Sequence, residues 1–298
     1  MSAPQRTHTQ SGHVTSLDGT RIGFTKSGTG PGLVLVQGAM ADLHAYDTLA
    51  QTLAPSFTVY AMDRRGRGTS PKTYTPAHTL DRDVEDIDAV LAHTGANLVF
   101  GLSSGAVITL EAARTLHRVT AAALFEPPFY PHGISRTGIK RLNTEIEQGD
   151  QPSALLDALL VAQTAPTPLR ILPRPLARAL ARIVLAVDDR RTPPRSTLRD
   201  LLPAVRYDFH DVQTADGTIT RYRSLTKPVL LLSGTRSPAF LQEAARTLHT
   251  VIPEARHTVI NRAGHDAPWN SGRPHAVATA LTDFFTTTQP NTPDGTAT

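Results

Sequence analysis

The residues best suited to chemistry in this 298-residue chain form the sequence GLSSG at positions 101–105. An apolar run at residues 97–102 predicts a buried strand that leads into it, and apolar spacing after Ser104 predicts a helix that leads out. A G-x-S-x-G sequence in this context is typical of a sharp turn that exposes a serine at the end of a sheet. We therefore predict that Ser103 is a nucleophile and that the backbone N–H of Ser104 stabilises an oxyanion. A glycine-rich turn without chemistry is the alternative.

A second oxyanion donor is expected in the sequence QGAM at residues 37–40, which follows an apolar, branched run at residues 33–37. A loop with a small glycine at a strand end allows the backbone N–H of Ala39 to point toward the same oxyanion. The next residue, Met40, is then expected to line the substrate pocket. A simple tight turn would show the same letters, so this prediction depends on its place in the order of elements.

A general base is expected at His265, which ends the sequence NRAGH after a short predicted strand at residues 258–260. A neutral imidazole beside a serine takes the hydroxyl proton during attack and returns it to the leaving group. The chain order, with the serine first and the histidine near the C-terminus, is the one that the strand-turn-helix serine motif requires. His44 is the nearest rival for a pocket role, and an exposed helix position is its simpler interpretation.

The composition excludes several other classes of site. The chain has no cysteine, so disulfides, thiolate nucleophiles and cysteine metal sites are absent. We expect a cytoplasmic protein without membrane contact, because the first residues are polar and no apolar run is long enough for a membrane span. Net charge is +4, and arginines are densest at residues 170–199. That stretch is either a solvated helix face or a basic lid that attracts acidic substrates. It lacks interleaved aromatic residues, so nucleic acid is not an expected partner.

The elements that must position these residues alternate along the first half of the chain. Apolar runs predict strands, and helical spacing predicts the segments between them, at residues 33–37 (strand), 42–53 (helix), 57–62 (strand), 80–91 (helix), 97–102 (strand), 104–116 (helix) and 119–125 (strand). A weak alternation at residues 21–26 suggests an edge strand. This order predicts an α/β fold with a mostly parallel central sheet and helices on both faces.

The alternation stops at residues 127–226, which are helical in pattern and punctuated by prolines. The segment is too long for an ordinary loop, so we expect a helical cap over the active-site end of the sheet, with Tyr130 and Tyr207 lining the pocket. The α/β core would then comprise residues 1–126 and 227–287. Residues 288–298 are polar, contain proline and glycine, and are expected to form a disordered tail.

Together these motifs resemble the α/β-hydrolase superfamily over nearly the whole chain. The matching sequences are QGAM, DRRGRGTS at residues 63–70, GLSSG, FEPP at residues 125–128 and AGHD at residues 263–266. The resemblance implies a serine esterase-like member with a helical cap insertion. It assigns the DRRGRGTS segment a structural role, in which Asp63 ends a strand and the glycines shape the next turn. Many members carry histidine before the nucleophile, where this chain has Leu102.

The expected acid of the triad departs from the family pattern. Ser237 stands where the usual carboxylate follows the strand PVLLL, and a hydroxyl does not orient an imidazolium by charge. Glu126 ends the strand after the serine helix, and some relatives place their acid there. We predict that Glu126 orients His265 through Nδ1. Alternatively, Glu126 binds backbone groups at the start of the cap, and Asp208 and Asp211 are remote candidates for the acid.

These observations predict a serine hydrolase that acts on a carboxylic ester, thioester or lactone through an acyl-enzyme. Neither a cofactor nor a metal is expected, since no His-x-x-x-His or carboxylate cluster is visible. The expected partner is a small-molecule substrate, and monomer and homodimer are both open. One alternative is a tailoring enzyme of secondary metabolism, such as a cyclase, acyltransferase or eliminase. A non-catalytic ligand-binding relative is another, suggested only by Ser237.

Overall fold

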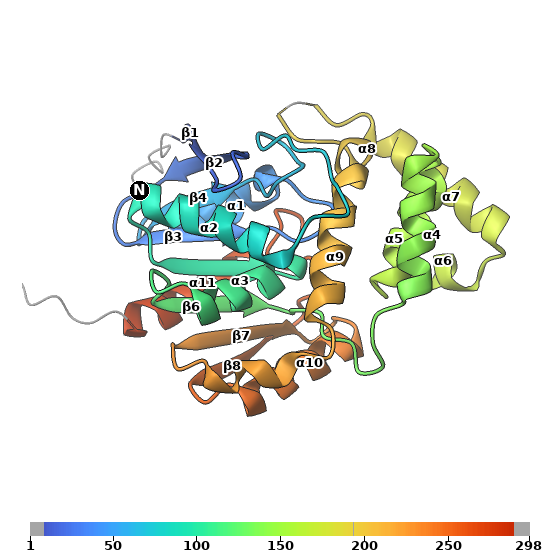
Figure 1. Ribbon diagram of the computed structural model, residues 1–298. Coiled ribbons are helices and arrows are strands. Elements are labelled where there is room, and N and C mark those ends of the chain that lie inside the picture. The colour runs from blue at the N-terminus through green and yellow to red at the C-terminus, as the bar shows by residue number, and fades with distance from the viewer. Residues whose placement is uncertain (1–8, 193, 289–298) are drawn as a thin grey trace, which may run out of the picture.

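The computed structural model describes residues 9–192 and 194–288 and is built around one eight-stranded sheet (Figure 1). The strands are β1 (Gln10–Thr15), β2 (Arg21–Ser27), β3 (Gly32–Val36), β4 (Thr58–Met62), β5 (Leu98–Leu102), β6 (Ala121–Phe125), β7 (Val229–Gly234) and β8 (Ala255–Ile260). Their order is β1-β2-β4-β3-β5-β6-β7-β8. β1 and β2 run antiparallel to their neighbours, and all pairs from β4 to β8 are parallel. The predicted α/β fold class is confirmed.

The central strands are continuous apolar runs because both of their faces are covered. Every residue of β5 (LVFGL) and β6 (AAALF) is buried, as expected for parallel strands between two helical layers. The edge strand β1, QSGHVT, is mostly exposed, and its largely polar residues show no pattern of apolar positions. The sequence pattern predicted the central strands and missed β1.

The helices of the core form one layer on each face of the sheet (Figure 1). η1 (Leu43–Tyr46), α1 (Asp47–Leu53) and α11 (Pro274–Thr288) share one apolar core. On the opposite face, α2 (Leu80–Thr94), α3 (Ser104–Thr115) and α10 (Ala239–Val251) pack into a second and larger core. The carboxyl ends of β3, β5, β6 and β7 therefore meet at one edge of a sandwiched sheet, where active sites of open α/β sheets form.

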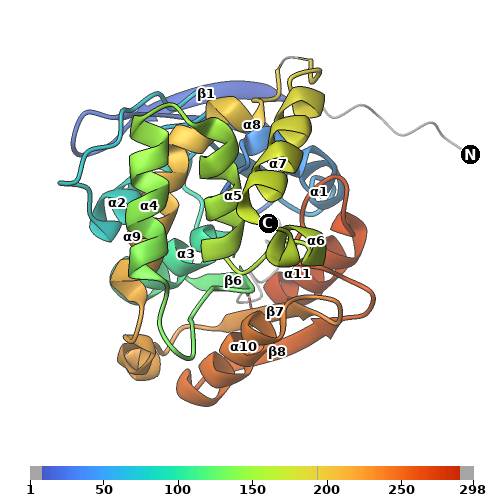
Figure 2. The same ribbon diagram turned by 90° about the vertical axis from the view of Figure 1, so that its right-hand side faces the viewer.

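A group of helices separates β6 from β7 in the sequence and stands beyond the strand ends; Figure 2 looks onto it. It consists of α4 (Arg136–Glu147), α5 (Gln151–Val161), α6 (Thr167–Ile171), α7 (Arg174–Asp188), α8 (Leu198–Leu201), η2 (Leu202–Ala204), α9 (Val205–Ala215) and η3 (Ile219–Ser224). We call these helices the cap. Helix α9 packs against both α3 and α4, so it lies between the core and the outer cap helices. The apolar core of the cap is continuous with the α2/α3/α10 layer.

Part of the arginine-rich stretch is used inside the cap. Arg174 donates to Asp157 on α5 and to Glu145 on α4, and Arg178 donates to Asp150 at the start of α5. These contacts join α7 to α4 and α5, so Arg174 and Arg178 help to hold the cap together.

The predicted tail at residues 288–298 lies outside the described residues except for Thr288, which ends α11. Among residues 9–192 and 194–288, no helix has the length and apolar character needed to cross a membrane.

Candidate active site

Ser103 lies at the sharp turn between β5 and α3. Its backbone has φ 55° and ψ −124°, a strained conformation for a residue with a side chain. The flanking glycines are required by close backbone approach. A Cβ on Gly101 would lie 2.4 Å from the Gly105 carbonyl oxygen, and a Cβ on Gly105 would lie 2.4 Å from the Gln37 carbonyl oxygen. The G-x-S-x-G sequence is thus a packing requirement that leaves the serine at the apex of the turn.

Backbone strain is concentrated at the ends of three adjacent strands. Five non-glycine residues in the described part of the chain have positive φ, and three of them are Met40, Ser103 and Glu126. These three follow β3, β5 and β6, which are neighbours in the sheet. Strained residues persist only where the surrounding structure holds them, and they cluster at functional sites. The strain therefore marks the strand ends that the sequence motifs also selected.

Glu126 and His265 are in direct contact. Oε2 of Glu126 lies 2.7 Å from Nδ1 of His265, and Oε1 accepts the backbone N–H of Gly234 at 2.7 Å. The Glu126 side chain is fully buried, whereas the His265 side chain is 23% exposed. The bond from Gly234 to Oε1 therefore fixes the glutamate in place while Oε2 faces the imidazole. The backbone group that Glu126 binds is at the end of β7 and not at the start of the cap, and the contact with His265 is made at the same time.

Ser103 and His265 line one apolar cavity with a volume of about 130 Å³. Within residues 9–192 and 194–288, no hydrogen bond joins the Ser103 hydroxyl to His265. Such contacts are often loose in ligand-free enzymes and tighten when substrate binds. The structure thus brings the serine and the Glu126–His265 pair to the same cavity without a formed serine–histidine bond.

The two expected oxyanion donors belong to residues in the wall of the Ser103 cavity. Ala39 and Ser104 line the same cavity, and among the described residues neither backbone N–H has a recorded acceptor. Asp63 fixes the end of the loop that carries Ala39, because its carboxylate accepts the backbone N–H of Leu43 at 2.8 Å and of Thr69 at 2.7 Å. Asp63 therefore links the first loop of the site to the DRRGRGTS turn.

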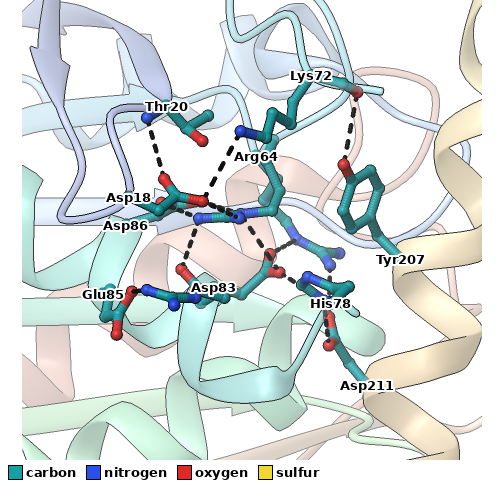
Figure 3. Close-up of polar contacts among 12 residues, drawn as sticks. Asp18, Thr20, Arg64, Lys72, His78, Asp83, Glu85, Asp86, Tyr207 and Asp211 are labelled. Atoms are coloured by element: carbon teal, nitrogen blue, oxygen red, sulfur yellow. Dashed lines mark hydrogen bonds and ion pairs between the residues drawn. The ribbon is translucent and has the colours of Figure 1, made fainter. Parts of the chain in front are cut away.

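Two of the three expected pocket residues lie in the cavity wall. Met40 and Tyr130 line it, and Tyr130 stacks on Phe240 with ring centroids 4.8 Å apart. Tyr207 was predicted to line the pocket, but its side chain does not line the cavity of Ser103. Its ring packs edge-on against His78 at 4.7 Å, and its hydroxyl faces the Lys72 carbonyl oxygen (Figure 3). Helical phase explains the error, because the cavity side of α9 carries Asp208 and Phe209 instead.

A second cavity, with a volume of about 820 Å³, lies between the cap and the loops after β3 and β8. It shares Met40, Leu159 and Trp269 with the first cavity, so these three side chains form the wall between the two. His44 lines the second cavity, where its ring faces Asp47 at 3.4 Å. The structure therefore does not place His44 at the serine.

The sequence patterns missed a buried ionic network beside the serine. Arg64, from the DRRGRGTS segment, donates to Asp83 on α2 and to Asp208 and Asp211 on α9. Figure 3 shows Arg64 beside Asp83, Asp211 and His78. These pairs span up to 147 residues of sequence. The only sequence signal was three arginines close together in a segment expected to form a tight turn. Asp208 and Asp211 are engaged with Arg64, so the structure does not place either beside His265.

The network shifts the pKa values of its members. Burial raises the pKa of Asp211 to about 7, and neighbouring Asp83 adds to the effect. Burial alone would lower the pKa of His78, but hydrogen bonds to Asp211 and Asp83 outweigh it and raise that pKa to about 9. His78 is therefore charged at neutral pH and shares the role of Arg64 as a buried cation.

The same residues are the ones whose geometry suits a metal. His78, Asp83 and Asp211 offer ligand atoms that lie within 4.8 Å of one another. The guanidinium of Arg64 already donates to both carboxylates, Nε to Asp83 at 3.1 Å and Nη2 to Asp211 at 3.0 Å. Arg64 thus already supplies positive charge to the two acids that a metal ion would neutralise.

Known proteins resemble this chain over most of its length. The model of the alpha/beta hydrolase family matches residues 33–280. A pimeloyl-(acyl-carrier protein) methyl ester esterase of Stenotrophomonas maltophilia is 29% identical over 278 residues, covering 89% of this chain and 96% of the esterase. A 2-(acetamidomethylene)succinate hydrolase of Mesorhizobium japonicum is 26% identical, covering 89% and 91%. A solved alpha/beta hydrolase of Sphaerobacter thermophilus is 31% identical, with a TM-score of 0.75 over 92% of this chain and 100% of that one.

Proposed function

The chain belongs to the alpha/beta hydrolase family, and from that premise we propose that it is a serine hydrolase cleaving carboxylic esters, thioesters or lactones through an acyl-enzyme. In this proposal the Ser103 oxygen attacks the carbonyl carbon while Nε2 of His265 accepts the hydroxyl proton. The protonated His265 then donates that proton to the leaving group. Water then attacks the acyl-enzyme while His265 accepts its proton, and His265 returns that proton to the Ser103 oxygen as the acid is released.

The observation that carries the proposal is the contact between Glu126 and Nδ1 of His265 at 2.7 Å, beside a strained serine in the same cavity. A carboxylate at Nδ1 fixes the tautomer whose Nε2 lone pair faces the cavity, and it stabilises the imidazolium. A protein that only bound a ligand would have no need of this pair. The backbone N–H groups of Ala39 and Ser104 would receive the oxyanion.

The size of the cavity indicates the substrate's shape. An apolar cavity of 150 Å³ in another protein holds one benzene molecule, so the 130 Å³ beside Ser103 suits an apolar group of about six carbon atoms. Its wall is largely apolar, from Tyr130, Phe209 and Phe240. The larger second cavity, past Met40 and Trp269, would take the rest of the substrate. We therefore expect an ester with one short apolar arm.

The test compares the wild type with Ser103→Ala on p-nitrophenyl acetate, butyrate and octanoate, and with a fluorophosphonate probe that labels activated serines. We expect turnover and labelling for the wild type, a preference for acyl chains of up to about six carbons, and neither activity for Ser103→Ala. Ser233→Ala is a matched control, because that buried hydroxyl contacts His257 outside the cavity. A folded wild type without turnover and without label would contradict the proposal.

A further inference from the structure

Asp208 is a buried carboxylate of the cap that the proposed reaction does not use. It belongs to α9 and is 1% exposed, yet it lines the cavity of Ser103. Its Oδ1 accepts the Ser104 hydroxyl at 2.6 Å and Nη1 of Arg64 at 2.5 Å, and its Oδ2 accepts Nη2 of Arg67 at 2.8 Å. One cap residue thus binds three groups of the core.

These groups are in turn connected to the two expected oxyanion donors, the backbone N–H groups of Ala39 and Ser104. Nη1 of Arg67 donates to the Gly38 carbonyl oxygen at 2.9 Å. That carbonyl and the N–H of Ala39 belong to the same planar peptide group, so holding one fixes the direction of the other. On the opposite side, Asp208 and Arg64 both hold the hydroxyl of Ser104, whose backbone N–H is the second expected donor.

The arginines themselves have few other choices of orientation. Arg64 is fixed from its far side by Asp83 and Asp211 (Figure 3). Arg67 is buried, and Asp208 is the only carboxylate that pairs with it among residues 9–192 and 194–288. Within the same residues its Nε has no hydrogen-bond partner. Removing the charge of Asp208 would therefore leave a buried guanidinium without a counter-ion beside the Gly38 carbonyl, which is costly.

We propose that Asp208 is a positioning residue: through Arg67 and Ser104 it holds the two oxyanion donors in place, so that the site is complete only when the cap is docked. The inference rests on the proposed function, since it concerns the same serine and the same N–H groups. It differs from a simple cap clamp, because a clamp would stabilise the protein without changing how well a tetrahedral adduct is bound.

The test is the isosteric variant Asp208→Asn. Losing an oxyanion donor outright costs about 10²–10³-fold in kcat, so displaced donors should cost about 10- to 100-fold. We expect KM for p-nitrophenyl butyrate to stay within about threefold. A trifluoromethyl ketone that adds to Ser103 should bind more weakly by the same factor as kcat falls.

Two further variants separate positioning from stability. Asp157→Asn removes another fully buried cap carboxylate, which pairs with Arg141 and Arg174 and has no contact with the cavity, so it should lower stability without changing kcat. Arg67→Lys keeps the counter-ion of Asp208 but loses the fork that reaches both Asp208 and Gly38, and we expect the same kinetic loss as for Asp208→Asn. If Asp208→Asn fails to fold, Arg67→Lys decides the matter.

The outcomes distinguish this inference from the proposed function. A wild type that neither turns over esters nor reacts with a fluorophosphonate refutes both. An active wild type whose Asp208→Asn and Arg67→Lys variants lose thermal stability but keep kcat and ketone affinity within about threefold refutes the positioning role alone. Parallel losses in kcat and ketone affinity at unchanged KM support it.

Discussion

Replacing Glu126 with glutamine tests the triad most directly, because the structure dictates how the new amide must lie. Oε1 of Glu126 accepts the Gly234 N–H at 2.7 Å, so the amide oxygen of glutamine must take that position to avoid facing one donor with another. The amide NH₂ then faces Nδ1 of His265. Nδ1 becomes an acceptor, and the proton moves to Nε2, which faces the cavity.

This tautomer leaves no lone pair to accept the serine proton. A triad with its acid amidated in this way loses about 10⁴-fold in kcat in a well-studied serine protease. We expect a loss of about 10³–10⁴-fold for Glu126→Gln, which corresponds to about 4–5.5 kcal/mol of transition-state stabilisation. KM should change little, because Glu126 is fully buried behind His265. The melting temperature should also hold, since the bond to Gly234 survives.

The assay is steady-state hydrolysis of p-nitrophenyl butyrate across pH 6–9, with thermal melting in parallel. Glu111→Gln is the matched control. Glu111 is a buried glutamate on α3 that pairs with Arg114 and Arg221, far along the helix from Ser103, and its replacement should lower stability but not kcat. If Glu126→Gln keeps kcat within about tenfold of the wild type, the orienting role is wrong and Glu126 serves only to bind the Gly234 backbone at the end of β7.

Three other results are expected. Gly105→Ala should lower both melting temperature and kcat, because its Cβ would lie 2.4 Å from the Gln37 carbonyl oxygen; unchanged values would refute the packing argument for this glycine. Burial lowers the pKa of His78, but its contacts, which include the hydrogen bond to Asp211, raise it by more, and the net result is a pKa of about 9. The stability linked to its charge is therefore complete below pH 6.5 and lost as pH rises through 9, so the melting temperature should fall over this range, and less steeply in His78→Gln. Phe209→Ala should enlarge the cavity, shift the best substrate from butyrate toward octanoate, and destabilise the protein by about 3 kcal/mol; an unmoved chain-length optimum would count against this cavity as the acyl site.

Residues at strand ends were predictable because their context is local. A buried apolar run followed by GLSSG selects Ser103 within a window of about a dozen residues, and the same holds for His265 after β8. Both lie at the cavity in the structure. Their roles in catalysis remain predictions. The fold class followed from the same local runs, since alternating strands and helices permit few arrangements.

Contacts between distant segments could not be predicted in this way. The pairing of Arg64 with Asp208 joins residues 144 positions apart, and nothing in either local sequence names the other. The phase of α9 was equally hidden, because it depends on η2 directly before it, and this is why Tyr207 was assigned to the wrong side. A run of charges is usually solvent-facing, so three arginines in one turn did not suggest burial.

The order of the strands explains why Glu126 reaches His265. β6 lies between β5 and β7, and the backbone of Glu126 donates to the Leu232 carbonyl oxygen on β7, while Ser103 donates to Phe125 on β6. A carboxylate at the end of β6 therefore stands between the serine and the loop that holds His265. A carboxylate after β7 would approach the same loop from the segment where the backbone N–H of Arg236 already donates to the Ala263 carbonyl oxygen. Ser237 is buried there, and its hydroxyl has no partner among the described residues, so that position is not engaged with the histidine. The strained φ of 50° at Glu126 is then the local cost of turning a β6 side chain toward His265.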